Sequence, residues 1–109
     1  MTMAPAPARA HEVTIHLDDD LLAGGLADVR WALLGTLHAG ARSLVVDLSR
    51  VQHLPDAAVA VLVSAHRICR ARGGTVVLRG ANRRTLDLLH RTGLERVLRL
   101  EQARRKDVA

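Results

Sequence analysis

His66 and Cys69 are the two residues whose types and spacing come closest to a metal site in this sequence. They lie three positions apart in a stretch with helical periodicity, so their side chains can lie on one face of a helix. A zinc site takes three or four ligands, and no further spaced His or Cys completes this set. We therefore expect no metal here, and we expect Cys69, the only cysteine, to be a small core residue.

Acidic and glycine-rich segments are the other candidates for a reactive site. The triplet Asp18–Asp20 could bind a divalent cation, but acidic residues between a strand and a helix are typical of a solvated turn. The pairs Gly24-Gly25 and Gly73-Gly74 match neither the dinucleotide nor the P-loop fingerprint, and they are expected to be turns. The sequence contains no recognisable set of acid, base and nucleophile residues at a catalytic spacing. It therefore predicts neither an enzyme nor a cofactor.

The net charge of +5 raises the question of nucleic-acid binding, because clustered arginines bind phosphate. The arginines of the second half, from Arg67 to Arg105, are interleaved with acidic residues, and Phe and Tyr are absent. This distribution is typical of solvated helix faces, so no nucleic-acid partner is expected. Lys106 is the only lysine, and Ala, Leu, Arg and Val dominate, as in proteins of GC-rich bacteria such as actinobacteria.

Length and hydropathy predict one compact domain in the cytoplasm. A chain of 109 residues is long enough for one core but not for two. No apolar run approaches the ~20 residues that span a bilayer, and the N-terminus lacks the apolar segment of a secretion signal, so no membrane insertion is expected. Residues 1–10, rich in Ala and Pro, are predicted to be a disordered leader, and residues 11–109 a single domain.

Hydrophobic periodicity predicts an α/β fold in which strands and helices alternate. Short connections between the elements favour a sheet of about four strands, largely parallel in its core, with the helices packed against it. Asp56 is the expected N-cap of the longest helix. The predicted strands are 12–17, 43–48, 75–79 and 97–100, and the predicted helices are 26–38, 57–72 and 83–91.

Three phrases from residue 43 onward follow one another in a recognisable order: SLVVDLSRV, CRARGGTVVLRG and LHRTGLERVL. In this order they resemble the STAS domains of bacterial anti-sigma-factor antagonists. Those domains carry a DLSxV-like strand end, an RGG entry to the next strand and a TGLxxV-like finish. The resemblance implies the STAS fold, a non-enzymatic role and a protein partner.

The start of the longest helix departs from the family pattern. Family members have Asp-Ser-Ser-Gly there, and a partner kinase phosphorylates the second serine. An ungapped alignment from Val51 places Pro55, Asp56, Ala57 and Ala58 at these positions, so Ala57 replaces the acceptor. The resemblance therefore implies a degenerate phosphorylation site, and a phosphate switch at this position is not expected.

A helical projection of residues 57–72 separates a face that should pack on the sheet from an opposite face. The opposite face begins with Val59, Ala60 and Val63, which are unusually apolar for an exposed surface, and such patches often mark partner sites. The resemblance places the family's docking surface at this helix start and the loop before it. The expected contact residues are Ser49, His53, Asp56, Ala57, Ala58, Val59, Ala60, Val63 and Arg67.

These features predict a regulatory module that binds a protein partner, with an anti-sigma-factor kinase as the first candidate. The alternative is an accessory subunit of an ABC-type lipid transporter, because small STAS proteins also bind such ATPases without a phosphorylation cycle. Nucleotide binding, a trait of some STAS relatives, is a third interpretation that no loop of this sequence supports. Trp31 lies off the apolar stripe of its helix and is interpreted either as a second contact or as a cover for the domain edge.

Overall fold

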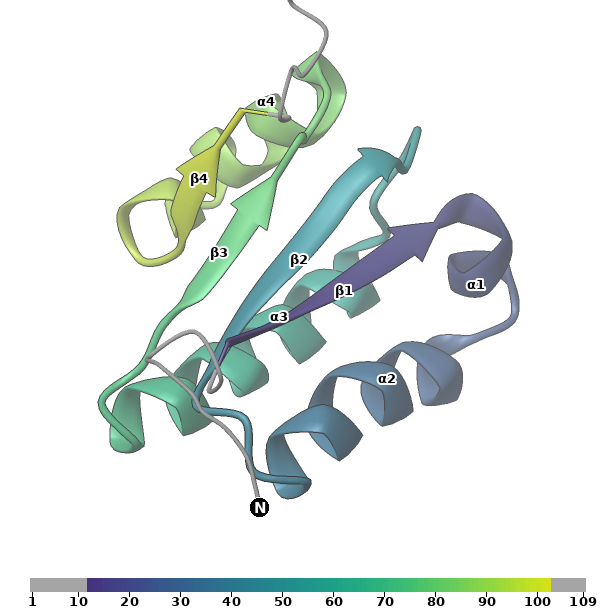
Figure 1. Ribbon diagram of the computed structural model, residues 1–109. Helices are drawn as coiled ribbons and strands as arrows, with labels where there is room; N and C mark the ends of the chain where they lie inside the picture. The colour runs from purple at the N-terminus through teal and green to yellow at the C-terminus, as the bar shows by residue number, and fades with distance from the viewer. Residues whose placement is uncertain (1–11, 103–109) are drawn as a thin grey trace, which may run out of the picture.

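The computed structural model describes residues 12–102, and the predicted leader at 1–10 lies outside the described residues. Four strands form one sheet in the order β1-β2-β3-β4, and each is parallel to its neighbours (Figure 1). The predicted fold class, an α/β sheet of about four strands, is therefore confirmed. The strands are β1 Glu12–Asp18, β2 Ser43–Arg50, β3 Val76–Arg79 and β4 Arg99–Glu101.

The helices alternate with these strands along the chain. They are α1 Asp19–Ala23, α2 Leu26–His38, α3 Asp56–Ala71 and α4 Arg83–Arg91, followed by a short 3-10 helix at Leu94–Arg96. The sequence pattern missed α1, which forms because the Asp18 carboxylate accepts the N–H of Leu21 at 2.8 Å and caps its start. The 3-10 turn delays the last strand, so β4 begins two residues later than predicted.

The hydrophobic core lies between the sheet and the helices. Alternate strand residues point toward it, and the register sets Val46 of β2 beside Ile15 of β1 and Leu78 of β3. Residues of α2, α3 and α4 join the same cluster, which places these helices against one face of the sheet (Figure 1). The largest fully buried side chains are Leu17, Leu33, Leu37, Leu44, Leu48, Leu54, Leu62, Leu78, Leu89, Leu98, Val29 and Val46.

The other face of the sheet carries a row of polar side chains across all four strands. His16, Asp47, Arg79 and Glu101 are register neighbours, with 3.7 Å between His16 Nδ1 and Asp47 Oδ2 and 3.4 Å between Arg79 Nε and Glu101 Oε1. Burial acts to raise the pKa of Asp47, but hydrogen bonds from the Ser49 hydroxyl and N–H, with the nearby charges of His16 and Arg79, lower it overall. The end of β2, where Ser49 lies, is thereby held by a charged carboxylate.

Candidate partner-docking site

The start of α3 is set by a proline. Pro55 takes the N-cap position with extended backbone, and its carbonyl accepts the N–H of Ala58 at 3.0 Å and of Val59 at 3.2 Å. Asp56 is therefore the first helical residue and not the N-cap, which corrects the sequence-based assignment by one position. Its exposed carboxylate makes no capping hydrogen bond, so its only favourable contribution to the helix is through the dipole.

The loop before α3, residues 51–55, is tied down from two sides. Val51 and Leu54 are buried in the core. The Asp19 carboxylate of α1 accepts the N–H of Gln52 at 3.0 and 3.1 Å. From the opposite direction the Asn82 amide donates to the carbonyl oxygens of Val51 at 3.3 Å and Gln52 at 3.1 Å. These bonds connect the loop that carries His53 to α1 and to the start of α4.

Two of the predicted contact residues are buried, which corrects their assignment. Ala58 is 2% exposed and Val59 is 9% exposed, and both belong to the core cluster. At 100° per residue the buried positions of α3 cover an arc of about 160°, wider than a single stripe, because α3 packs against neighbouring elements on its flanks as well as on the sheet. Val59 lies at the margin of that arc, and the projection of one helix cannot reveal its neighbour.

The remaining predicted contact residues are accessible. Val63 is half-buried and continues the exposed side of α3 one turn beyond Ala60. Ser49 lies at the end of β2, which extends to Arg50, and not in the loop where the sequence pattern placed it. The exposed members are Ser49, His53, Asp56, Ala57, Ala60 and Arg67. We call these six residues and Val63 the docking surface.

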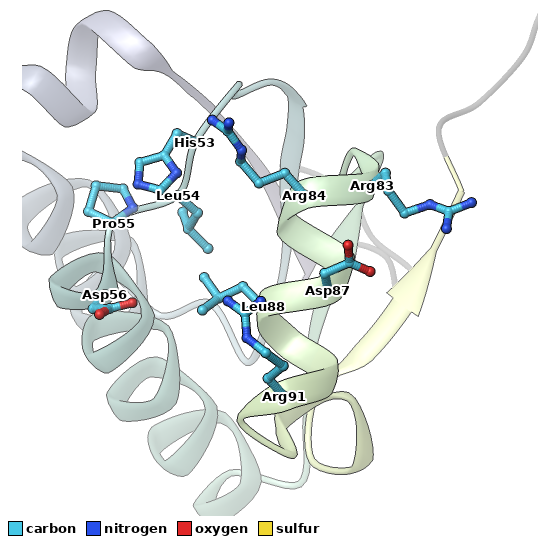
Figure 2. Close-up of a pocket in the computed structure, with 9 residues that line it drawn as sticks. All are labelled: His53, Leu54, Pro55, Asp56, Arg83, Arg84, Asp87, Leu88 and Arg91. Carbon is cyan, nitrogen blue, oxygen red and sulfur yellow. The ribbon is translucent and has the colours of Figure 1, made fainter.

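A groove of about 1080 Å³ borders the docking surface, between the start of α3 and α4 (Figure 2). Figure 2 shows the side chains of Arg84, Leu88 and Arg91 on α4 opposite His53, Pro55 and Asp56. None of the groove arginines forms an ion pair with an acidic residue in the part of the chain that the structure describes. The full lining is His53, Leu54, Pro55, Asp56, Arg83, Arg84, Asp87, Leu88 and Arg91.

The α4 side of this groove was missed from the sequence. Arg84, Leu88 and Arg91 are spaced by four and three residues, which places them on one side of a helix. That spacing was the available signal, but it matches any solvated helix face. Only the tertiary contact of Asn82 with the loop at 51–52 brings the start of α4 to the docking surface.

The other chemical candidates of the sequence have structural roles. Cys69 is fully buried, and burial raises the pKa of its thiol. Burial, with the Arg70 charge, lowers the pKa of His66, whose Nδ1 is buried without a hydrogen-bond partner. Among the described residues no three His, Cys, Asp or Glu side chains are placed to hold a metal ion. In the acidic triplet, Asp18 caps α1 and Asp19 holds Gln52.

The candidate site therefore combines small apolar residues, a hydrogen-bonded loop and a groove with mixed charge. Ala57, which the ungapped alignment sets at the acceptor position, is exposed. Within residues 12–102, no helix has the length and apolar character that crossing a bilayer requires.

Comparisons with known proteins identify the same fold. The solution NMR structure of the protein TM1081 has a TM-score of 0.71 and 19% sequence identity, covering 84% of this chain and 74% of that one. A crystal structure of tm1081 from Thermotoga maritima, described as a proposed anti-sigma factor antagonist, has a TM-score of 0.63 and 18% identity, covering 82% and 72% of the two chains. Among curated proteins none gives a significant match.

A family model described as "Mlab, STAS domain" matches residues 6–101, which include every strand and helix of the fold. The structural matches support the fold, and the family match confirms the resemblance that the three sequence phrases indicated. The chain belongs to the STAS family, in the branch described as Mlab, STAS domain.

Proposed function

We propose that this protein is a non-enzymatic regulatory module of the cytoplasm that docks a protein partner through the docking surface. The observation that carries the proposal is the exposed start of α3, where Ala57 and Ala60 leave room for a partner to approach the helix closely. The loop beside them is fixed by Asp19 and Asn82, so little conformational entropy is lost on docking.

The docking is proposed to be independent of phosphorylation at the family position. Ala57 has no hydroxyl, so no kinase can add a charge of about −2 there. The nearest upstream hydroxyl, on Ser49, donates to the Asp47 carboxylate at 2.5 Å. A phosphate on Ser49 would replace this hydrogen bond with repulsion between two anions. Incubation with an anti-sigma-factor kinase and ATP should leave the protein unmodified, and phosphate found on Ser49 would overturn this part of the proposal.

The sequence analysis predicts two alternative classes of partner, and both are ATP-binding proteins. An anti-sigma-factor kinase is supported by the fold match to the Thermotoga maritima protein. The ATPase of an ABC-type lipid transporter is favoured by another observation. Ala57 removes the acceptor that a kinase cycle uses. A transporter ATPase that is docked permanently needs no such acceptor.

The test is capture of partners from the source cell with the full-length protein, followed by direct titration of the captured ATPase. Ala60→Glu places a charge in the centre of the docking surface, and Ala71→Glu places the same charge at the exposed far end of α3 as a matched control. We expect Ala60→Glu to weaken binding at least tenfold and Ala71→Glu to leave it unchanged. Equal affinities for the two variants would remove the docking surface from the proposal.

A further inference from the structure

The outer face of α2 carries a large, exposed apolar side chain where a solvated helix would be polar. Val29, Leu33 and Leu37 form its inner face and are fully buried. On the outer side Trp31 is 80% exposed. Because α2 has apolar residues on both sides, it is only weakly amphipathic, unlike α4. At 100° per residue the outer face consists of Ala27, Asp28, Trp31, Gly35 and His38, while Leu34 at its margin packs against the core.

Gly35 lies one helical turn from Trp31 and has no role in the fold of a single chain. A Cβ at this position would meet nothing within 4 Å, so no neighbouring element requires the glycine. Its backbone is ordinary helix, and glycine there is less favourable than alanine by about 1 kcal/mol. The pair therefore presents an exposed indole beside a shallow notch, each unexplained by the packing of the monomer.

We propose that the outer face of α2 binds the same face of a second copy of this chain in an antiparallel, twofold-symmetric pair. In an isologous contact residue i meets residue j and j meets i. If Trp31 of one copy fits into the notch at Gly35 of the other, the twofold axis passes the helix at position 33, midway between these residues. Residues 28 and 38 have the same midpoint, so the same axis places Asp28 of one copy opposite His38 of the other.

The second pairing supplies the complementarity that identifies a second copy as the occupant. The Asp28 carboxylate accepts hydrogen bonds, and the His38 ring has an N–H that can donate one. Both are exposed, at opposite ends of the outer face, and neither forms an ion pair with another described residue. One helix thus contains both members of each pair, Trp31 with Gly35 and Asp28 with His38. Both pairs are centred at position 33.

The size of the contact predicts a weak dimer. A tryptophan buries about 150–250 Å², so two indoles supply roughly 400 Å². A stable interface buries about 1,200–2,000 Å² in total, which is more than the outer face of a 13-residue helix provides. The dimer should dissociate on dilution. It uses none of the docking-surface residues, so the inference is independent of the proposed function.

Trp31 is a built-in reporter for this contact, because the chain has one Trp and neither Tyr nor Phe. We would measure sedimentation velocity and intrinsic fluorescence of the full-length chain over a dilution series. Burial of Trp31 should shift its emission to shorter wavelength as the concentration rises, in step with growth of a species of twice the chain mass.

Gly35→Gln fills the notch and improves helix propensity, so it should raise the melting temperature while weakening self-association at least tenfold. Ala71→Gln, on the exposed end of α3, should leave self-association unchanged. A chain that stays monomeric with constant emission at its highest soluble concentration overturns the proposal. A dimer that Gly35→Gln does not weaken overturns it as well, because its contact then lies elsewhere.

Discussion

The docking surface and the outer face of α2 are both exposed parts of one helical layer, but they are built differently. The docking surface combines β2, a loop and α3, and its loop is held by hydrogen bonds from Asp19 and Asn82. The outer face of α2 belongs to a single helix, whose position depends on the burial of Val29, Leu33 and Leu37. One surface therefore depends on polar tethers between elements and the other on apolar packing.

This difference has a consequence for how each surface responds to change. Loss of a polar tether releases the loop locally and leaves the core intact, so the docking surface can lose its shape without unfolding of the domain. Loss of apolar packing acts on the core cluster that α2, α3 and α4 share, so it destabilises both surfaces together. Substitutions at Val59, Asn82, Val63 and Asp56 test this distinction, and their expected effects decrease in this order.

Val59→Glu should have the largest effect, because it places a carboxylate in the hydrophobic core cluster. We expect the free energy of unfolding to fall by about 3 kcal/mol or more. Ala60→Glu changes the adjacent, exposed residue and should alter stability by no more than about 0.5 kcal/mol. Urea denaturation of both variants measures this contrast, and similar stabilities would mean that Val59 is not a core residue.

Asn82→Ala should act on the loop of the docking surface and on the start of α4. Asn82 accepts the N–H of Thr85 at 2.8 Å as the N-cap of α4 and donates to the loop at Val51 and Gln52. Loss of the cap and of these bonds should cost about 2 kcal/mol of stability. Hydrogen exchange of residues 51–55 should accelerate, while that of α2 should change only with global stability.

Asn82→Asp separates the two roles of this side chain. An aspartate can still accept the Thr85 N–H, but it has no amide to donate to the loop. We expect this variant to retain α4 and still show faster exchange at Gln52. Protected exchange at Gln52 in Asn82→Asp would show that Asp19 alone fixes the loop.

Val63→Glu should weaken partner binding by about tenfold, because the added charge is desolvated only in the complex. This change corresponds to a loss of more than ~1 kcal/mol of binding free energy. Val63 is half-buried, so the side chain can turn its carboxylate to solvent in the free protein and the fold should remain stable. Self-association through α2 should be unaffected. Titration with the partner and a dilution series of the same sample check both statements, and unfolding of the variant would assign Val63 to the core.

Some of these features were predictable from the sequence and others depended on contacts between distant residues. The strands and the three longer helices follow from local periodicity, so their order and the parallel sheet could be inferred. The conformation of the loop depends on Asp19 meeting Gln52, 33 positions away, which no local pattern shows. Val59 was assigned to the exposed face because the projection of a single helix does not include the elements packed beside it. The arginines of α4 were interpreted as solvated because their spacing does not show that residues 53–56 lie opposite them.

Asp56→Asn should have the smallest effect, and it tests whether a fixed charge at the start of α3 controls docking. Because Pro55 is the N-cap and Asp56 makes no capping bond, the substitution removes only the interaction of the carboxylate with the helix dipole. The cost should be a few tenths of a kcal/mol, at the low end of such interactions.

The alternative role for Asp56 is that its carboxylate, one position before Ala57, imitates the phosphorylated state and keeps the protein off a kinase partner. A carboxylate carries one charge against roughly two for a phosphoserine, and arginines of the same groove oppose it, so we expect affinity to remain nearly unchanged. Asp56→Ser, which restores the family residue, should behave like Asp56→Asn. Calorimetry at fixed salt decides the matter: a tenfold gain in affinity for an anti-sigma-factor kinase in both variants would establish Asp56 as a built-in phosphomimic.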